Sequence, residues 1–226
     1  MIRESFHFRE TFATILAEDP AHAAAAKAGM LSARQVLEAY IARDPFFAVT
    51  FDPYEPDSDE LVITRMAAAA RRAGVGPMAA VAGTIAWAGV EAMGGGGGSF
   101  AVIDSGGDID LVSDRPVRVG VHAGGAALSN RVAFVVPPQE KILGICTSSA
   151  TVGPSVSFGI ADAVTIFSRD VALADAWATS VCNQTSPDDR SVLDRIDPAE
   201  VEGIFSIIGD VTVRWGALPP LVPAVV

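Results

Sequence analysis

An aspartate and a threonine in the last third of the chain have the types and spacing of a metal site. Asp175 and Thr179 lie four residues apart in the segment 171–183, which is predicted to be a helix. Residues four apart share one face of a helix, and a carboxylate with a hydroxyl supplies hard oxygen ligands suited to Mg²⁺. The alternative is a solvated aspartate and a threonine bonded back to its own helix. On spacing alone, this alternative is favoured.

A glycine turn flanked by acids is the second candidate site. Gly106 and Gly107 separate Asp104 from Asp108, and Asp110 follows, so three carboxylates lie within seven positions. Glycine permits positive φ and lets a ligand approach the backbone closely. A hairpin turn whose aspartates bond their own backbone has the same composition, and the turn by itself favours that reading.

A segment rich in hydroxyl groups is the third candidate. Six serines and threonines lie between Cys146 and Gly159, among them Thr147 and Ser148. Their hydroxyls could donate hydrogen bonds to phosphates or to a ring edge, or the segment could be a polar surface loop. It contains no GxSxG motif, so a nucleophile elbow is not indicated. We predict that residues 143–161 form a loop.

The sequence assigns no catalytic residue. Asp104, Asp108, Asp162 and His122 are each a candidate general base, and none is favoured over the others. The three histidines are scattered and form no HExxH motif, so zinc chemistry is not indicated.

The charge balance restricts the partners. The chain of 226 residues has 27 acidic and 16 basic residues, a net charge of −11. Nucleic-acid binding normally needs a basic surface, and an anionic membrane surface would repel the chain. We therefore expect neither partner. A phosphate ligand would need backbone N–H groups and a divalent metal to neutralise it.

The pattern of apolar residues and breakers predicts a mixed order of elements. Strands are expected at 5–12 (extending, or followed by a second strand, through 15), 46–51, 100–104, 109–112, 117–121, 131–136, 163–167 and 211–215. Helices are expected at 21–42, 57–72 with Asp57 and Glu60 as a capping box, 78–93, 171–183 and 198–207. This order favours an α+β fold over a doubly wound sheet, as one domain spanning residues 1–226.

The remaining features concern compartment and assembly. The N-terminus carries charges throughout and has no apolar signal region, which predicts a cytoplasmic protein. Cys146 and Cys182 are expected to be free buried thiols, although a disulfide between them stays open. The uncharged stretch 73–90 reads as a buried helix rather than a membrane span, and the five glycines 94–98 as a connector. Abundant Gly and Ala would suit a homo-oligomer interface.

Three segments occur in an order that resembles the ApbE-like superfamily, whose members transfer FMN from FAD or bind flavin. They are a Gly/Ala helix (PMAAVAGTIA, 77–86), a GGD turn (IDSGGDI, 103–109) and a late helix with DAxAT (LADAWATS, 173–180). The resemblance covers roughly residues 60–185. It implies a two-layer, T-fold-like α+β domain with a mixed or antiparallel sheet and packed helices.

The resemblance also implies a metal and its ligands. A Mg²⁺ ion would be held by Asp175, Thr179 and the carbonyl of Ala82. Thr147 and Ser148 would correspond to the polar loop before the diphosphate of FAD, which is the implied ligand or substrate.

Further residues would then lie near the nucleotide. These are Gly106, Gly107 and Asp108 of the glycine turn, and Gly83 and Thr84, which stand where the family's helix usually carries a Lys in an AKGY-like motif. The family's HIIDP motif is absent, and residues 152–159 occupy its place. The chain is therefore expected to be a compact branch of the superfamily.

Three functions follow from these observations. The first is a Mg²⁺-dependent protein acting on a flavin or related nucleotide, as an FMN transferase if it is active. The second is a flavin or nucleotide binding module without catalysis, which the missing HIIDP and Lys favour. The third is a structural or assembly protein that kept the fold.

Overall fold

A large antiparallel sheet is the centre of the fold. The computed structural model describes residues 1–94, 99–153 and 157–224. The sheet has eight strands, and their order in space is their order in the chain: β1 (Ile2–Phe8), β2 (Thr11–Ala17), β3 (Phe100–Ser105), β4 (Asp108–Ser113), β7 (Gln139–Ser148), β8 (Ala163–Ser168), β9 (Gly203–Ile208) and β10 (Val211–Gly216).

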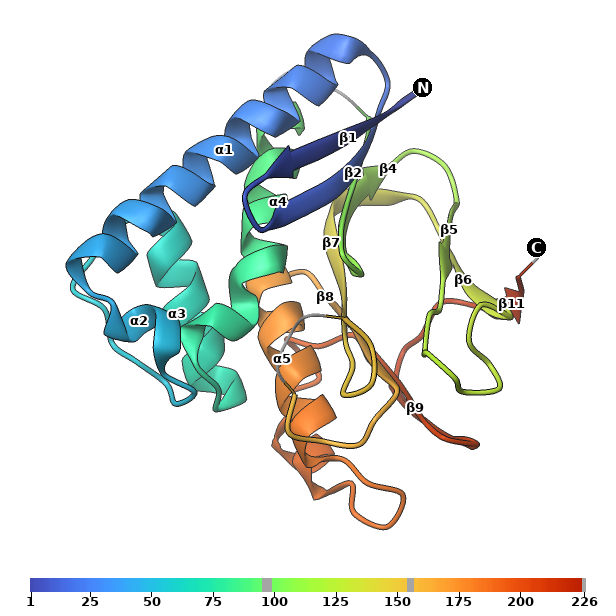
Figure 1. Cartoon of the computed structure of the whole chain (residues 1–226). Coiled ribbons are helices and arrows are strands. Elements are labelled where there is room, and N and C mark those ends of the chain that lie inside the picture. Colours follow the sequence, from blue (N-terminus) through green and yellow to red (C-terminus); the bar gives the residue numbers. More distant parts are fainter. Residues whose placement is uncertain (95–98, 154–156, 225–226) are drawn as a thin grey trace.

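Helices cover one face of this sheet, and a small sheet lies on the other face (Figure 1). The helices are α1 (Pro20–Arg43), α2 (Phe46–Val49), α3 (Leu61–Ala73), α4 (Val81–Gly94) and α5 (Val171–Gln184), with 3₁₀ turns η1 (Pro77–Ala80) and η2 (Ser191–Arg195). The small sheet consists of β5 (Val117–Gly120), β6 (Val132–Val136) and β11 (Leu221–Pro223). The α+β class is therefore confirmed.

Local signals in the sequence set the ends of the principal helices. Asp19 accepts hydrogen bonds from the backbone N–H groups of Ala21 and His22 and so caps α1. Asp170 caps α5 in the same way, by accepting from Leu173 N–H. Gly74, with φ +71°, ends α3.

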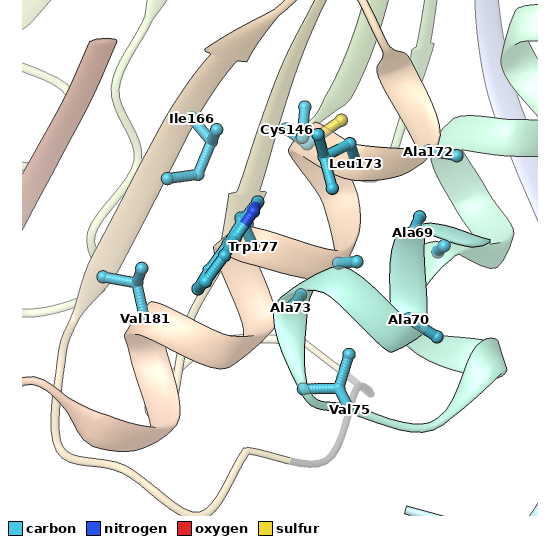
Figure 2. Close-up of a cluster of buried hydrophobic side chains, with 14 of the residues drawn as sticks. Ala69, Ala70, Ala73, Val75, Cys146, Ile166, Ala172, Leu173, Trp177 and Val181 are labelled. Atoms are coloured by element: carbon cyan, nitrogen blue, oxygen red, sulfur yellow. The ribbon is translucent and has the colours of Figure 1, made fainter. Parts of the chain in front are cut away.

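Small side chains bring α3 close to α5 on the helical face of the sheet. Figure 2 shows Trp177 of α5 between Ile166 of β8 and the end of α3, where Ala73 faces it. Trp177 and its apolar neighbours are buried, so water is excluded from this side of α5. Burial of this apolar surface stabilises the position of α5 on the sheet.

Aromatic rings fill the space between the two sheets. Phe134 of the small sheet meets Phe167 and Phe205 of the large sheet edge to face, with ring centroids 5.0 and 5.4 Å apart. The large sheet is therefore buried on both faces at β8 and β9, and every residue of these two strands is buried.

Glycines permit the close crossing of α1 and α4. A Cβ added to Gly89 of α4 would lie 2.5 Å from Ile103 Cδ1 and 2.8 Å from Met30 Cγ. A Cβ on Gly29 of α1 would lie 2.6 Å from the carbonyl oxygen of Ala88. A glycine inside a helix costs about 1 kcal/mol relative to alanine. The close packing of α1 against α4 explains why glycine is nevertheless present at these two positions.

Replacing Gly89 with Ala should destabilise the protein despite the gain in helix propensity. Overpacking of this kind costs about 1–3 kcal/mol, and urea unfolding would measure the loss. Gly94→Ala is the control, because no described atom lies within 4 Å of a Cβ there. Equal stability of Gly89→Ala and the native chain would contradict the proposed tight crossing.

Four sequence-based element assignments are wrong. Residues 46–49 form helix α2 rather than a strand, and the predicted helix at 198–207 is replaced by strand β9. The predicted loop at 143–161 begins with six residues of β7. Glu60 precedes α3 without a side-chain capping bond, so the capping box is not formed. The glycine connector lies, apart from Gly94, outside the described residues.

Two further predictions concern burial. Cys146 and Cys182 are both free and buried, as expected. Among the described helices none is by itself long and apolar enough to cross a bilayer; only the bent pair 61–73 and 77–94, at 107°, reaches the required length and composition.

Candidate functional site

A cavity of about 780 Å³ lies between α5, the start of α4 and the segment that follows α2. We call it the α5 cavity, because Asp175, Thr179 and Asn183 of α5 all line it. These three residues are spaced by four, which places them along one face of the helix. The volume is within the range of sites for nucleotides and other small ligands.

Asp175 is fixed by the beginning of α4. The backbone N–H of Gly83 donates to Asp175 Oδ2 at 2.9 Å. A Cβ on Gly83 would lie only 3.1 Å from Asp175 Cβ, so glycine allows the two helices to approach. The Asp175 carboxylate is thus oriented by the protein, and its two oxygens have the capacity to accept further bonds from a ligand.

Most of the residues predicted from the sequence come together at this cavity. Ala82, Asp108, Thr147 and Ser148 line it together with Asp175 and Thr179. Thr84 does not belong to the described lining; its hydroxyl donates to the Ala80 carbonyl at 2.6 Å within the helix.

Gly106 and Gly107 lie at a second cavity, of about 650 Å³, on the other side of β7. We call it the hairpin cavity, because the β1–β2 hairpin forms one wall. Asp104 and His122 line it as well. Thr147 belongs to the lining of both cavities, so the two are neighbours through this residue.

Burial raises the pKa of two carboxyls at the α5 cavity. Desolvation, together with the charge of Asp104, raises the pKa of Asp108 to about 7, although the Thr147 N–H, which donates to Asp108 Oδ1 at 3.1 Å, opposes the rise. Desolvation also raises the pKa of Asp175 well above its usual value, and the charge of Asp108 adds to this effect. Both groups would be more easily ionised beside a cation.

A third carboxyl lies deeper in the same region; it belongs to Asp110, which the sequence places among the acids of the glycine turn without a role of its own. Asp110 is fully buried on β4, and neither of its side-chain oxygens has a hydrogen-bond partner among the described residues. Desolvation raises the pKa of Asp110 well above its usual value, followed by the charges of Asp108 and Asp175. Uncompensated burial of a charge is costly, so the environment of Asp110 favours its neutral form.

The lining favours a metal that binds together with its ligand. It contains two carboxylates and, among its described residues, no Lys, Arg or His. The described residues also include no group of three His, Cys, Asp or Glu side chains that could hold a metal alone. Mg²⁺ is usually bound by one or two carboxylates plus substrate phosphates. The oxygens of Asp175, Thr179 and Ala82 fit such an ion.

The sequence between positions 3 and 216 matches the profile of a protein family described as AbpE bacteria. The chain belongs to this family. The resemblance inferred from the Gly/Ala helix, the GGD turn and the DAxAT helix is confirmed. Two curated relatives are each named UPF0280 protein. One, from Methanoregula boonei, is 67% identical over 99% of this chain and 94% of its own length. The other, from Methanoculleus marisnigri, is 60% identical over 99% and 92%.

Two solved structures share the fold of this family member. The apo flavinyl transferase ApbE of Pseudomonas stutzeri aligns with a TM-score of 0.60 and 13% identity, over 95% of this chain and 94% of that one. The H257G mutant of the flavin transferase ApbE from Vibrio cholerae aligns with a TM-score of 0.51 and 12% identity, over 96% and 97%. At this identity the likeness shows the fold.

Proposed function

We propose that this protein binds the diphosphate of FAD with Mg²⁺ in the α5 cavity and acts as an FMN transferase. The observation that carries the proposal is the oxygen-rich face of α5, where Asp175 and Thr179 line the same cavity as Ala82 and no described cation belongs to the lining. A diphosphate entering this cavity would meet carboxylates, so a cation must accompany it.

The chain's own groups would orient the diphosphate. Asp175 and Thr179 would hold the metal with the carbonyl of Ala82, and the metal would offset charge on the phosphates. Ser148, at the end of β7, would donate a hydrogen bond to a phosphate oxygen, whereas the Thr147 hydroxyl is paired with that of Thr165 at 2.9 Å on the other face of the strand.

Among the four candidate bases, Asp108 is favoured by its position. It lines the α5 cavity, whereas Asp104 and His122 line the hairpin cavity. A pKa of about 7 suits proton transfer near neutral pH. Asp108 would take the proton from an acceptor hydroxyl, whose oxygen would bond to the phosphorus of the FMN half. The bond to the bridging oxygen would break, and AMP would leave with that oxygen.

A binding module without transfer is the second candidate function. It is favoured by the segment 152–159, which has no His where the transferases carry HIIDP. The α5 cavity would then hold the intact flavin nucleotide.

Titration of FAD, followed by flavin fluorescence with and without Mg²⁺, tests both functions. We expect Mg²⁺ to strengthen FAD binding by about tenfold or more, because the carboxylates repel the diphosphate unless a cation lies between them. By reciprocity, FAD must strengthen Mg²⁺ binding by the same factor. Thr179→Val should weaken this coupling, whereas Thr179→Ser should retain it.

The products separate the two functions. AMP released in the presence of a hydroxyl acceptor supports transfer, and intact FAD after long incubation supports the binding module. Mg²⁺-independent binding would contradict the metal site, and absence of binding under either condition would reject both functions.

A further inference from the structure

Two phenylalanines meet at the α5 cavity, although they come from distant parts of the chain. Phe51 follows α2, and Phe158 lies near the end of the hydroxyl-rich segment; both line the cavity. Their rings pack edge to face with centroids 5.2 Å apart and an interplanar angle of 75°. Yet Phe51 is 63% exposed and Phe158 is 66% exposed. Large apolar side chains left this open at a cavity often mark a binding site.

The backbone on the Phe51 side is fixed by a glycine turn. A Cβ on Gly76 would collide with the carbonyl oxygen of Thr50 and lie 3.0 Å from Phe51 Cα. The segment after α2 therefore packs directly against the turn between α3 and η1. The backbone at Phe51 is therefore held in place by its packing against this turn.

The backbone on the Phe158 side is fixed by α5. Asn183 Oδ1 accepts from the Phe158 N–H at 2.8 Å and from the Ser157 hydroxyl at 2.8 Å. Gly159 lies against the Cys182 carbonyl, so that any Cβ there would collide with it. Asn183 is the third residue of the α5 face that carries Asp175 and Thr179. The aromatic pair is thus tied to the helix that would hold the metal.

We infer that Phe51 and Phe158 form a stacking site for a planar heteroaromatic ring of the bound nucleotide. The inference rests on the proposed function and adds the part of the ligand that lies outside the diphosphate. Asp175 and the two phenylalanines line the same cavity, and Asn183, which binds the Phe158 N–H, lies two helical turns along α5 from Asp175. A nucleotide diphosphate has the matching order of groups, because its charged phosphates are followed by a flat ring.

The ring could be the isoalloxazine or the adenine of FAD, since both stack on aromatic faces. Stacking of a nucleic-acid base on an aromatic side chain is worth about 1–3 kcal/mol by alanine substitution. The tethered backbones on both sides lower the ordering cost that a mobile aromatic residue would add to binding.

The test compares Phe51→Ala and Phe158→Ala with Phe46→Ala as the matched control. Phe46 is also exposed, at 56%, but it packs on Tyr54 and does not belong to the described lining. FAD, FMN and ADP are titrated separately with Mg²⁺. We expect each cavity variant to weaken FAD binding by roughly tenfold or more, and Phe46→Ala to leave it unchanged. Phe51→Tyr and Phe158→Tyr should restore affinity.

The three probes show whether the isoalloxazine or the adenine ring of FAD occupies the stacking site. Loss of FAD and FMN affinity with ADP unchanged assigns the site to the flavin, and loss of FAD and ADP affinity with FMN unchanged assigns it to adenine. In either case the strengthening of binding by Mg²⁺ should persist, because the metal ligands are untouched.

Other outcomes overturn the inference. Native FAD affinity in both alanine variants, with Mg²⁺ dependence retained, rejects the stacking site and leaves the proposed function standing. A change in oligomeric state without a change in affinity assigns the two rings to a contact between copies of the chain. If the native chain binds none of the three probes, the proposed function fails and the stacking site fails with it.

Discussion

Replacing Asp175 with Asn should abolish the Mg²⁺ dependence of FAD binding while the chain still folds. The Asn side-chain carbonyl can still accept the Gly83 N–H, which Asp175 Oδ2 accepts at 2.9 Å in the native chain. It carries no charge, however, and is a poor substitute for the carboxylate beside a diphosphate. Loss of an outer-shell partner costs roughly 10–100-fold in metal affinity, so loss of a direct ligand should cost at least about 100-fold. Calorimetric titration of Mg²⁺ into the FAD-saturated protein measures the change.

Stability provides the control for this substitution. Without metal, Asp175→Asn should be at least as stable as the native chain, because desolvation raises the pKa of the Asp175 carboxyl and disfavours its charged form. Asp170→Asn is the matched variant on the same helix, since Asn also caps helices well, and it should keep the native response to Mg²⁺. An Asp175→Asn protein that retains native coupling between FAD and Mg²⁺ would rule out Asp175 as the ligand.

The metal-free protein should lose stability as the pH rises above about 4, and Asp110→Asn should reduce this loss. The pKa of Asp110 is raised in the folded state, from 3.8, chiefly by desolvation. The folded chain therefore keeps a proton that the unfolded chain releases, and stability is greatest below the unfolded pKa. Each pH unit over which this difference persists costs about 1.4 kcal/mol of the free energy of unfolding.

Urea unfolding at several pH values, with EDTA present, measures the slope of the free energy of unfolding against pH. Asp108, whose pKa is about 7, contributes in the same direction up to that pH, so the slope should fall rather than vanish. Asp59→Asn, at an exposed position, should leave the slope unchanged. A native slope in Asp110→Asn would mean that Asp110 does not hold a proton in the folded state.

The elements with clear periodicity and caps were predicted well, whereas the buried strand β9 and the end of β7 were not. β9 has the sequence GIFSII and is buried at every position. A strand covered on both faces shows no alternation, so it cannot be told from a buried helix by pattern alone. The end of β7 is rich in Gly, Ser and Thr, which resembles a loop. Its pairing with β4 and β8 decides its conformation, and this pairing is not visible in the local sequence.

The residues of the candidate site also fall into two groups: those that the local sequence predicts and those whose position depends on the tertiary fold. The spacing of Asp175 and Thr179 follows from helix geometry, and the order of the three family segments indicated Ala82 as their partner. The placement of Gly106 and Gly107 at the hairpin cavity depends on where the β3–β4 turn ends relative to β7, which no local signal sets. The meeting of Phe51 with Phe158 requires the complete tertiary fold. Asn183 could have been found, because it continues the four-residue spacing on α5.

The coincidence of spatial and chain order in the large sheet has a consequence for folding kinetics. Most neighbouring strands are joined by short connections or by a single helix, so they can pair early. The longest connection is that of the β2–β3 pair, because residues 18–99, with helices α1 to α4, lie between the two strands. Closing so long a loop is slow and entropically costly. We therefore expect the β1–β2 hairpin to join the sheet last and to exchange its amide hydrogens first, which would remove one wall of the hairpin cavity while the lining of the α5 cavity stays intact.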